Sequence, residues 1–405
     1  MTNNNETSHL KNLPFGISLN EIVVAIWVCS SFYIMYATGG ENASLLFLAL
    51  IGGVAALILL TYKKAVIATV PPLVSLGAFL LNISILSSYL CNKERYECIF
   101  IAGNIFSSLL LFVSLYLITT KIDLDFRKTL IVQCVLISVL LPVVLVTAPV
   151  SWGRVNPPTS PNYVGMMALL AFSGALSVRS VTWASVVAGL PLYSILVLQS
   201  RDSLLAAAIA LVIVASSLFW RHRSKKFSAY LLLAFFGSLA LCFALVLIGV
   251  PVFESLDRTF EGLFMLNDEH RGIGTGASGR TELWAAAVNL WLTNPIFGVG
   301  FKGHQMLMPD QMWAHNAYLG MLADLGLAGL AGYLLMISPA IGYIFKRKAR
   351  FSPEYPQRAM IILTYLFYGL FETRAFSFGN SYSVIFMLTV FDCSKRRLRS
   401  EAPAP

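Results

Sequence analysis

Three basic side chains lie where a polar loop of the sequence turns into an apolar helix. Arg201 stands in the short connection LQSRDSLLA, Arg280 opens the stretch RTELWAAAVNLWLT, and His315 precedes the apolar stretch NAYLGMLADLGLAGL. Arginine carries a permanent positive charge that attracts anions, and a neutral imidazole can accept a proton. These residue types therefore suit anion binding combined with proton transfer.

Two of these residues also have a simpler interpretation. Arg201 can snorkel from a helix end to the membrane surface, and His315 can be an interfacial histidine that is only solvated. Against the first, a very short connection on the side where arginines are scarce is a costly place for a charge without a role. Against the second, the helix that follows His315 presents the positive end of its dipole, which favours the neutral imidazole.

Three further polar residues are secondary candidates. Asn316 suits the N-cap position of the helix that starts at Ala317. Asp324, two turns inside that helix, is costly in a membrane, so we expect it to face a polar cavity or an intramembrane partner. Arg154 lies in the proline-rich segment PVSWGRVNPPTSPNYVG, where a lone arginine is most simply a solvated charge.

The composition predicts which elements must position these residues. The 405-residue chain is 57% hydrophobic and only 12% charged, whereas soluble domains carry about a quarter charged residues. Many apolar runs are long enough to cross a hydrocarbon core of about 30 Å. We therefore predict an all-α polytopic membrane protein with about twelve transmembrane helices, at about 21–38, 43–61, 65–87, 99–119, 129–148, 161–178, 181–199, 203–220, 228–250, 316–345, 359–372 and 378–392.

The basic residues predict the orientation of these helices. If both termini are cytoplasmic, 20 of the 29 Lys and Arg residues fall on the cytoplasmic side, as the positive-inside rule requires. This placement explains the net charge of +9 better than a nucleic-acid partner does. Arg201, Arg280 and His315 then lie outside. We expect residues 1–405 to form one membrane domain, with the late periplasmic loop 251–315 capping the site.

The segment around Arg280 is predicted to be an amphipathic helix over 280–293. Trp284 and Trp291 fall on one helical face, so the helix would lie on the membrane with Arg280 at its start. The preceding GTGASG formally matches G-x-G-x-x-G, but no strand precedes it and no βαβ unit follows, so a dinucleotide site is rejected. The sequence has no HExxH, no pair of CxxC motifs and no Asp/Glu/His cluster, so neither a metal nor another cofactor is expected.

Two cysteines share one short outer loop. Cys91 and Cys98 delimit the segment CNKERYEC, and a structural disulfide between them is plausible in an oxidising compartment such as a bacterial periplasm. The sequence leaves open whether they are bonded or are both free thiols.

Four segments of the chain, in order and spacing, resemble the O-antigen ligase/polymerase superfamily of bacterial envelope glycosyltransferases, and most of all its O-antigen ligases. They are SPNYVGMMALLA, SRDSLLAAAIAL, SGRTELWAAAVNLWLTNPIFGVGF and HNAYLGMLADLGLAGL, about a fifth of the chain. The many predicted spans with one large late periplasmic loop fit the same superfamily.

The resemblance implies a metal-independent, inverting transfer at the periplasmic face of the bacterial inner membrane. The donor would be a polysaccharide on undecaprenyl diphosphate, and the acceptor a sugar hydroxyl of lipid A–core. Arg201 and Arg280 fall on the arginine pair of the family and His315 on its histidine, whereas Arg154 matches no firm family position. Arginine forks bind phosphate bidentately, and a histidine of ordinary pKa, about 6.5, can act as general base for the acceptor hydroxyl.

Two alternatives remain open at this point. An O-antigen polymerase or a protein O-oligosaccharyltransferase of the same superfamily would use the same kind of donor with a different acceptor. A transporter of lipid-linked glycans belongs to another class, and transporters place charged residues and broken helices near the membrane midplane. Here the candidate charges gather on one face, which favours the enzyme.

Overall fold

The computed structural model describes most of the chain. The described residues are 17–38, 50, 52–54, 57–58, 60–61, 68–151, 154–155, 157, 159–178, 180–198, 200–222, 276–352, 354–372 and 380–397. The predicted span 228–250 and the first part of the predicted loop, 251–275, lie outside the described residues, as do most of the predicted span 43–61 and the two ends of the chain.

The described part of the chain is almost entirely helical. Its α-helices are α1 Leu19–Thr38, α3 Pro72–Leu90, α4 Cys98–Lys121, α5 Phe126–Thr147, α6 Pro161–Ala175, α7 Val181–Val197, α8 Arg201–His222, α11 Gly276–Thr293, α12 His304–Leu307, α13 Ala317–Phe345, α14 Arg347–Arg350, α15 Tyr355–Tyr368 and α16 Ser381–Ser394. The short 3-10 helices are η2 Lys93–Arg95 and η4 Pro309–Gln311. The two-residue strands form two antiparallel pairs, β1 Ala68–Thr69 with β4 Arg396–Arg397 and β2 Val150–Ser151 with β3 Arg154–Val155.

The all-helical class predicted from the sequence is confirmed. Most predicted spans coincide with a described helix to within a few residues at each end, because the apolar runs that define them are local features. Within the described residues, α3, α4, α5 and α13 are long and apolar enough to cross a membrane. The total of about twelve spans and the orientation of the helices stay predictions.

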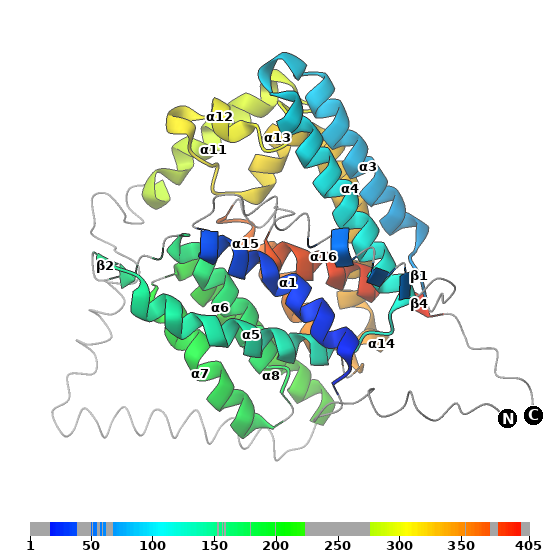
Figure 1. Cartoon of the computed structure of the whole chain (residues 1–405), viewed down its shortest axis with the longest axis vertical. Coiled ribbons are helices and arrows are strands. Elements are labelled where there is room, and N and C mark those ends of the chain that lie inside the picture. The colour runs from blue at the N-terminus through cyan, green and yellow to red at the C-terminus, as the bar shows by residue number, and fades with distance from the viewer. Residues whose placement is uncertain are drawn as a thin grey trace, which may run out of the picture.

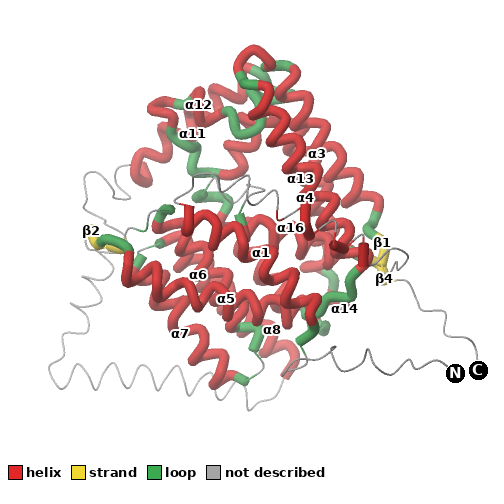
Figure 2. The backbone as a smooth tube through the Cα atoms, viewed as in Figure 1, coloured by secondary structure: helices red, strands yellow, loops and turns green. Residues whose placement is uncertain are grey.

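The helices are arranged as an inclined arm and a body (Figures 1 and 2). The arm contains α3, α4 and α13, the body contains α1, α5, α6, α7, α8, α15 and α16, and α11 and α12 lie beside the upper part of α13. Glycines allow α3 and α13 to approach closely: a Cβ on Gly77 would lie 2.3 Å from the backbone N of Met336, and one on Gly332 would lie 2.8 Å from that of Leu81. Small residues at such contacts are typical of helix packing in membranes.

The helix predicted at 316–345 is present but is broken at Gly326. Gly326 has φ 62° and ψ −162°, outside the helical region. The connection that follows α11 crosses α13 at this point, where the N–H groups of Leu327 and Ala328 donate to the carbonyls of Pro295 and Ile296 at 2.9 and 3.0 Å. A Cβ at position 326 would lie 2.4 Å from the carbonyl of Ile296. Glycine is therefore required both by the backbone conformation and by the crossing chain.

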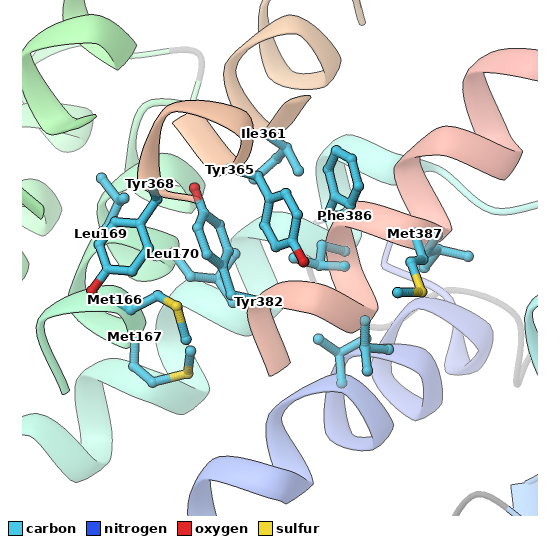
Figure 3. Close-up of a cluster of buried hydrophobic side chains, with 14 of the residues drawn as sticks. Met166, Met167, Leu169, Leu170, Ile361, Tyr365, Tyr368, Tyr382, Phe386 and Met387 are labelled. Carbon is cyan, nitrogen blue, oxygen red and sulfur yellow. The ribbon is translucent and has the colours of Figure 1, made fainter. Parts of the chain in front are cut away.

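A cluster of fully buried side chains joins α15 and α16 to α6 (Figure 3). The ring of Tyr365 stacks on that of Phe386 with centroids 3.9 Å apart. Two hydroxyls in this cluster are satisfied by side chains of α15 and α16: Tyr382 shares a hydrogen bond of 2.6 Å with Thr364, and Tyr365 donates to Ser383 at 3.0 Å. Burial of these rings fixes α15, whose C-terminal end reaches the site described next.

Candidate functional site

The starts of α8 and α11 meet through an ion pair. Nη2 of Arg280 lies 3.6 Å from Oδ2 of Asp202, the second residue of α8. Arg201 is the first residue of α8, so its backbone lies beside this contact, although its side chain lies outside what the structure describes. The fold therefore brings the first turn of α8 next to the first turns of α11. These are the two segments that carry the predicted arginine pair, Arg201 and Arg280.

Arg280 does not start its helix, contrary to the sequence prediction. The helix α11 begins at Gly276, so Arg280 lies one turn inside it. Glycine lowers helix propensity by only about 1 kcal/mol relative to alanine, and tertiary contacts routinely override propensity. The unpaired N–H groups at the start of α11 therefore lie one turn away from Arg280, and an anion at Arg280 is bound by the guanidinium without them.

His315 lies at the junction between the outer connection and α13, next to a carboxylate. It has a left-handed backbone conformation, φ 47°, and its Nδ1 lies 3.9 Å from Oε2 of Glu372. The imidazole is 31% exposed, whereas the Glu372 side chain is only 8% exposed. Nδ2 of Asn162 donates to the other oxygen of Glu372 at 2.5 Å. The carboxylate is thus held in place by α6 while the imidazole stays accessible.

Tyr368, at the end of α15, lies near both charged pairs. Its hydroxyl donates to the carbonyl of Asn162 at 2.9 Å, the side chain of Asn162 donates to Glu372, and α15 packs against α8, which carries Asp202. The pair Arg280–Asp202 and the pair His315–Glu372 therefore belong to one site around the end of α15. This site is assembled from α6, α8, α11, α15 and the start of α13, which are distant in the sequence.

The start of α13 is fixed against the end of α15. The side chain of Asn316 accepts hydrogen bonds from the backbone N–H groups of Tyr318 and Leu319, both at 3.0 Å, so its predicted N-cap position is confirmed. Its Nδ2 also donates to the carbonyl of Leu370 at 3.2 Å, and the N–H of Ala317 donates to that of Gly369 at 2.7 Å. These bonds hold His315, the preceding residue, beside Glu372.

Asp324 has the buried partner that the sequence analysis expected, and the partner is His304. One carboxylate oxygen accepts from the backbone N and from Nδ1 of His304, at 2.8 and 2.9 Å, and the other accepts from the backbone N of Lys302 at 2.9 Å. Asp324 thereby fastens the connection between α11 and α12 to the break in α13. Among the described residues, the hydrogen bonds of the Asp324 carboxylate all go to Lys302 and His304. Its observed role is therefore to hold this connection against α13.

A small second core links α11 to the segment before His315. Ala287 on α11 is fully buried together with Met308 and Ala314, and Leu319 packs against them. Ala287 belongs to the apolar face predicted for this helix, and Nε1 of Trp291 on the same face donates to the carbonyl of Pro295 at 3.1 Å. That α11 lies on a membrane surface stays a prediction.

The remaining sequence candidates lie at the edges of the structure. Arg154 belongs to β3 and pairs in register with Ser151, and its side chain lies outside the described residues. Cys91 follows the last residue of α3 and Cys98 begins α4, and both thiols are free and exposed in the structure. A disulfide between them stays a prediction. Within the described residues, no group of three or more His, Cys, Asp or Glu could hold a metal ion.

The sequence analysis missed three residues of this site: Glu372, Asn162 and Tyr368. Glu372 carried one usable signal, because a carboxylate at the end of a predicted span is costly without a partner. Asn162 lies in the quoted segment SPNYVGMMALLA, but no local pattern shows that its side chain reaches a carboxylate 210 positions away.

One family model matches part of the chain. Residues 184–334 match the family model described as O-Antigen ligase, a range that contains Arg201, Arg280 and His315 but neither Asn162 nor Glu372. No curated protein matches the chain. Members of this family are glycosyltransferase-like enzymes of lipopolysaccharide biosynthesis. The match confirms the resemblance to the O-antigen ligase/polymerase superfamily over residues 184–334.

Proposed function

We propose that this protein is an O-antigen ligase. It transfers a polysaccharide from undecaprenyl diphosphate to a sugar hydroxyl of lipid A–core, at the periplasmic face of the bacterial inner membrane, with both termini in the cytoplasm. The family match supports chemistry of the O-antigen ligase/polymerase type. The observation that carries the proposal is the convergence of Arg280, the start of α8 and the His315–Glu372 pair around the end of α15.

Arg280 and Arg201 bind the diphosphate of the donor. The 3.6 Å separation between Arg280 and Asp202 exceeds hydrogen-bond distance, so a diphosphate with its several negative charges can displace the carboxylate. As the bond between the anomeric carbon and the phosphate oxygen breaks, the electron pair leaves with the diphosphate. Arginine stabilises this growing negative charge, and such stabilisation is usually the largest catalytic contribution.

His315 acts as the general base for the acceptor hydroxyl. A proton held on Nδ1 beside Glu372 places the basic lone pair on Nε2, the arrangement that a carboxylate enforces in catalytic triads. Nε2 takes the hydroxyl proton while the acceptor oxygen attacks the anomeric carbon from the side opposite the diphosphate. Glu372 stabilises the imidazolium that forms. One direct displacement inverts the anomeric centre and needs neither a metal nor a nucleotide.

Two other functions use parts of the same evidence. A polymerase or a protein O-oligosaccharyltransferase would perform the same donor chemistry on a different acceptor. A transporter of lipid-linked glycans would require its charged residues near the midplane of the bundle. Asp202 and His315 instead lie at the starts of α8 and α13, and Arg280 lies one turn inside α11, which supports a reaction site at one face.

The test is deletion of the gene followed by electrophoresis of the lipopolysaccharide, with complementation by the intact gene and by His315→Ala. A ligase leaves bare core together with polymer still bound to its lipid carrier, and only the intact gene restores the full-length product. Core that carries a single repeat would instead indicate a polymerase. Normal lipopolysaccharide with unglycosylated protein would indicate an oligosaccharyltransferase.

A further inference from the structure

A pocket of about 760 Å³ lies at the end of α13 opposite to His315. Its apolar lining, here called the apolar wall, includes Leu73 and Leu76 from α3 and Pro339 from α13. Its polar lining, here called the rim, includes Tyr343, Lys346 and Ser394, at the ends of α13 and α16. A pocket lined by apolar side chains and a cation suits an amphiphile with a negatively charged head.

The apolar wall continues the outer surface of a helix that is apolar and long enough to cross a membrane. Leu73 and Leu76 are 42% and 48% exposed on α3. In a membrane, side chains exposed on such a surface contact lipid acyl chains. An acyl chain can therefore enter the pocket from the surrounding lipid without crossing a polar barrier.

Lys346 is the cation of the pocket that has no acidic partner among the described residues. The two neighbouring cations are neutralised by carboxylates: Arg358 pairs with Asp392 and Glu354, and Lys395 pairs with Asp392. The Tyr343 hydroxyl accepts from Nη1 of Arg358 at 3.3 Å, so its own proton can be donated to a phosphate oxygen. The rim thus offers one positive charge and one hydroxyl donor to an anion.

The sequence around the pocket adds to its positive potential. Lys346 opens the segment KRKAR, and Lys395 opens the segment KRRLR just after Ser394. Basic pockets and segments of this kind at a membrane boundary attract anionic lipid head groups.

From these observations we propose that the pocket binds one acidic glycerophospholipid of the phosphatidylglycerol class. The lipid comes from the leaflet on the side of the basic segments. Its phosphate contacts Lys346 and the Tyr343 hydroxyl, and one acyl chain lies along Leu73, Leu76 and Pro339. Because α3, α13 and α16 all line the pocket, the bound lipid ties them together and stabilises the folded protein by mass action. This site is separate from the proposed transfer chemistry and does not depend on it.

The test is native mass spectrometry of the purified full-length protein, titrated with dioleoyl phosphatidylglycerol or dioleoyl phosphatidylcholine. We expect preferential retention of one phosphatidylglycerol. Lys346→Ala should weaken it about fivefold, the effect expected for one basic residue at an anionic lipid surface. Arg350→Ala is the matched control, because Arg350 is exposed in the same basic segment but does not line the pocket.

A second pair of variants tests the apolar wall without changing any charge. Leu76→Trp fills the pocket and should lower phosphatidylglycerol retention, whereas Leu86→Trp, at a surface position further along α3, should not. Equal retention of both lipids would overturn the proposal. An equal loss of phosphatidylglycerol retention in Lys346→Ala and Arg350→Ala would also overturn it, because it would indicate binding to diffuse surface charge. Unchanged retention in Leu76→Trp would overturn it as well. Binding of soluble glycerol 3-phosphate as tight as that of the lipid would also overturn it.

Discussion

The two ends of α15 each carry a charged cluster, and the two clusters are built differently. Near its start, Nη2 of Arg358 lies 2.5 Å from Asp392 and 2.7 Å from Glu354, and its guanidinium lies over the ring of Tyr343 at 5.6 Å. Lys395 also contacts Asp392, at 2.6 Å. The side chain of Asp392 is only 3% exposed. These charges satisfy one another and join α13, α15 and α16.

At the other end of α15 the charged pairs are looser. The distance is 3.6 Å in Arg280–Asp202 and 3.9 Å in His315–Glu372, and the basic side chains are 20% and 31% exposed. Neither distance is short enough for a hydrogen bond between the two charged groups. Close, buried pairing therefore indicates charges that hold the fold together, and we interpret the longer, partly exposed pairs as charges of the proposed transfer site.

The largest effect that would sharpen this comparison is expected at His315. Loss of a general base typically lowers the rate by about 10²–10⁴-fold, so His315→Ala should reduce transfer by that order while donor binding stays nearly intact. Binding of the lipid-linked donor and the rate at saturating donor measure the two separately. Raising the pH should not revive the variant. Weakened donor binding with an unchanged rate at saturating donor would show that His315 only binds the substrate and is not a general base.

The next largest effect is expected at the tight cluster, and on stability rather than on transfer. Removing one partner of a buried ion pair costs about 3–5 kcal/mol, so Arg358→Ala should lower the thermal unfolding temperature of the purified protein markedly. His315→Ala is the control and should leave that temperature nearly unchanged. If Arg358→Ala kept its thermal unfolding temperature and lost only transfer activity, the tight cluster would not serve stability. The distinction between a stabilising cluster and a catalytic cluster would then be wrong.

The arginines of the loose cluster should behave in the opposite way to Arg358. Arg280→Ala and Arg201→Ala should each reduce transfer by about 10²–10³-fold, the effect of losing one charge-stabilising donor, with little change in thermal stability. Lysine at either position should rescue only part of the activity, because a point charge replaces a bidentate fork. Full activity in both lysine variants would show that charge alone is sufficient. Arg350→Ala controls for a general loss of positive charge.

The smallest effect is expected at Glu372. Glu372→Gln should lower the transfer rate at neutral pH about tenfold, or about 1.4 kcal/mol, because a neutral amide no longer stabilises the imidazolium that forms on His315. A neighbouring carboxylate favours the protonated form of an imidazole. Without the charge of Glu372, His315 should therefore become protonated only at a lower pH. The acidic limb of the pH–rate profile at saturating donor should therefore move to lower pH. An unmoved acidic limb with a lower plateau would mean that Glu372 only supports the local fold.

The sequence by itself determined the features that depend on short stretches of chain. The helical class, the limits of most helices and the N-cap at Asn316 were predicted correctly, because apolar runs and capping residues act within a few positions. The three candidate residues Arg201, Arg280 and His315 were chosen from their segments and from the order of those segments, and their roles stay predictions. The start of α11 at Gly276 was missed, since its first turn has the composition of a loop.

The tertiary structure alone decided what the charged residues contact. The break at Gly326 depends on the chain that crosses α13 there, and the pairing of Asp324 with His304 depends on the same crossing. Glu372 meets His315 only because α13 is fixed against the end of α15. Ion pairs and hydrogen bonds act over a few ångströms between groups that are far apart in the chain, so no local pattern encodes their partners. Helices, in contrast, form from neighbouring residues, and this is why the sequence placed the helices while the fold selected the partners.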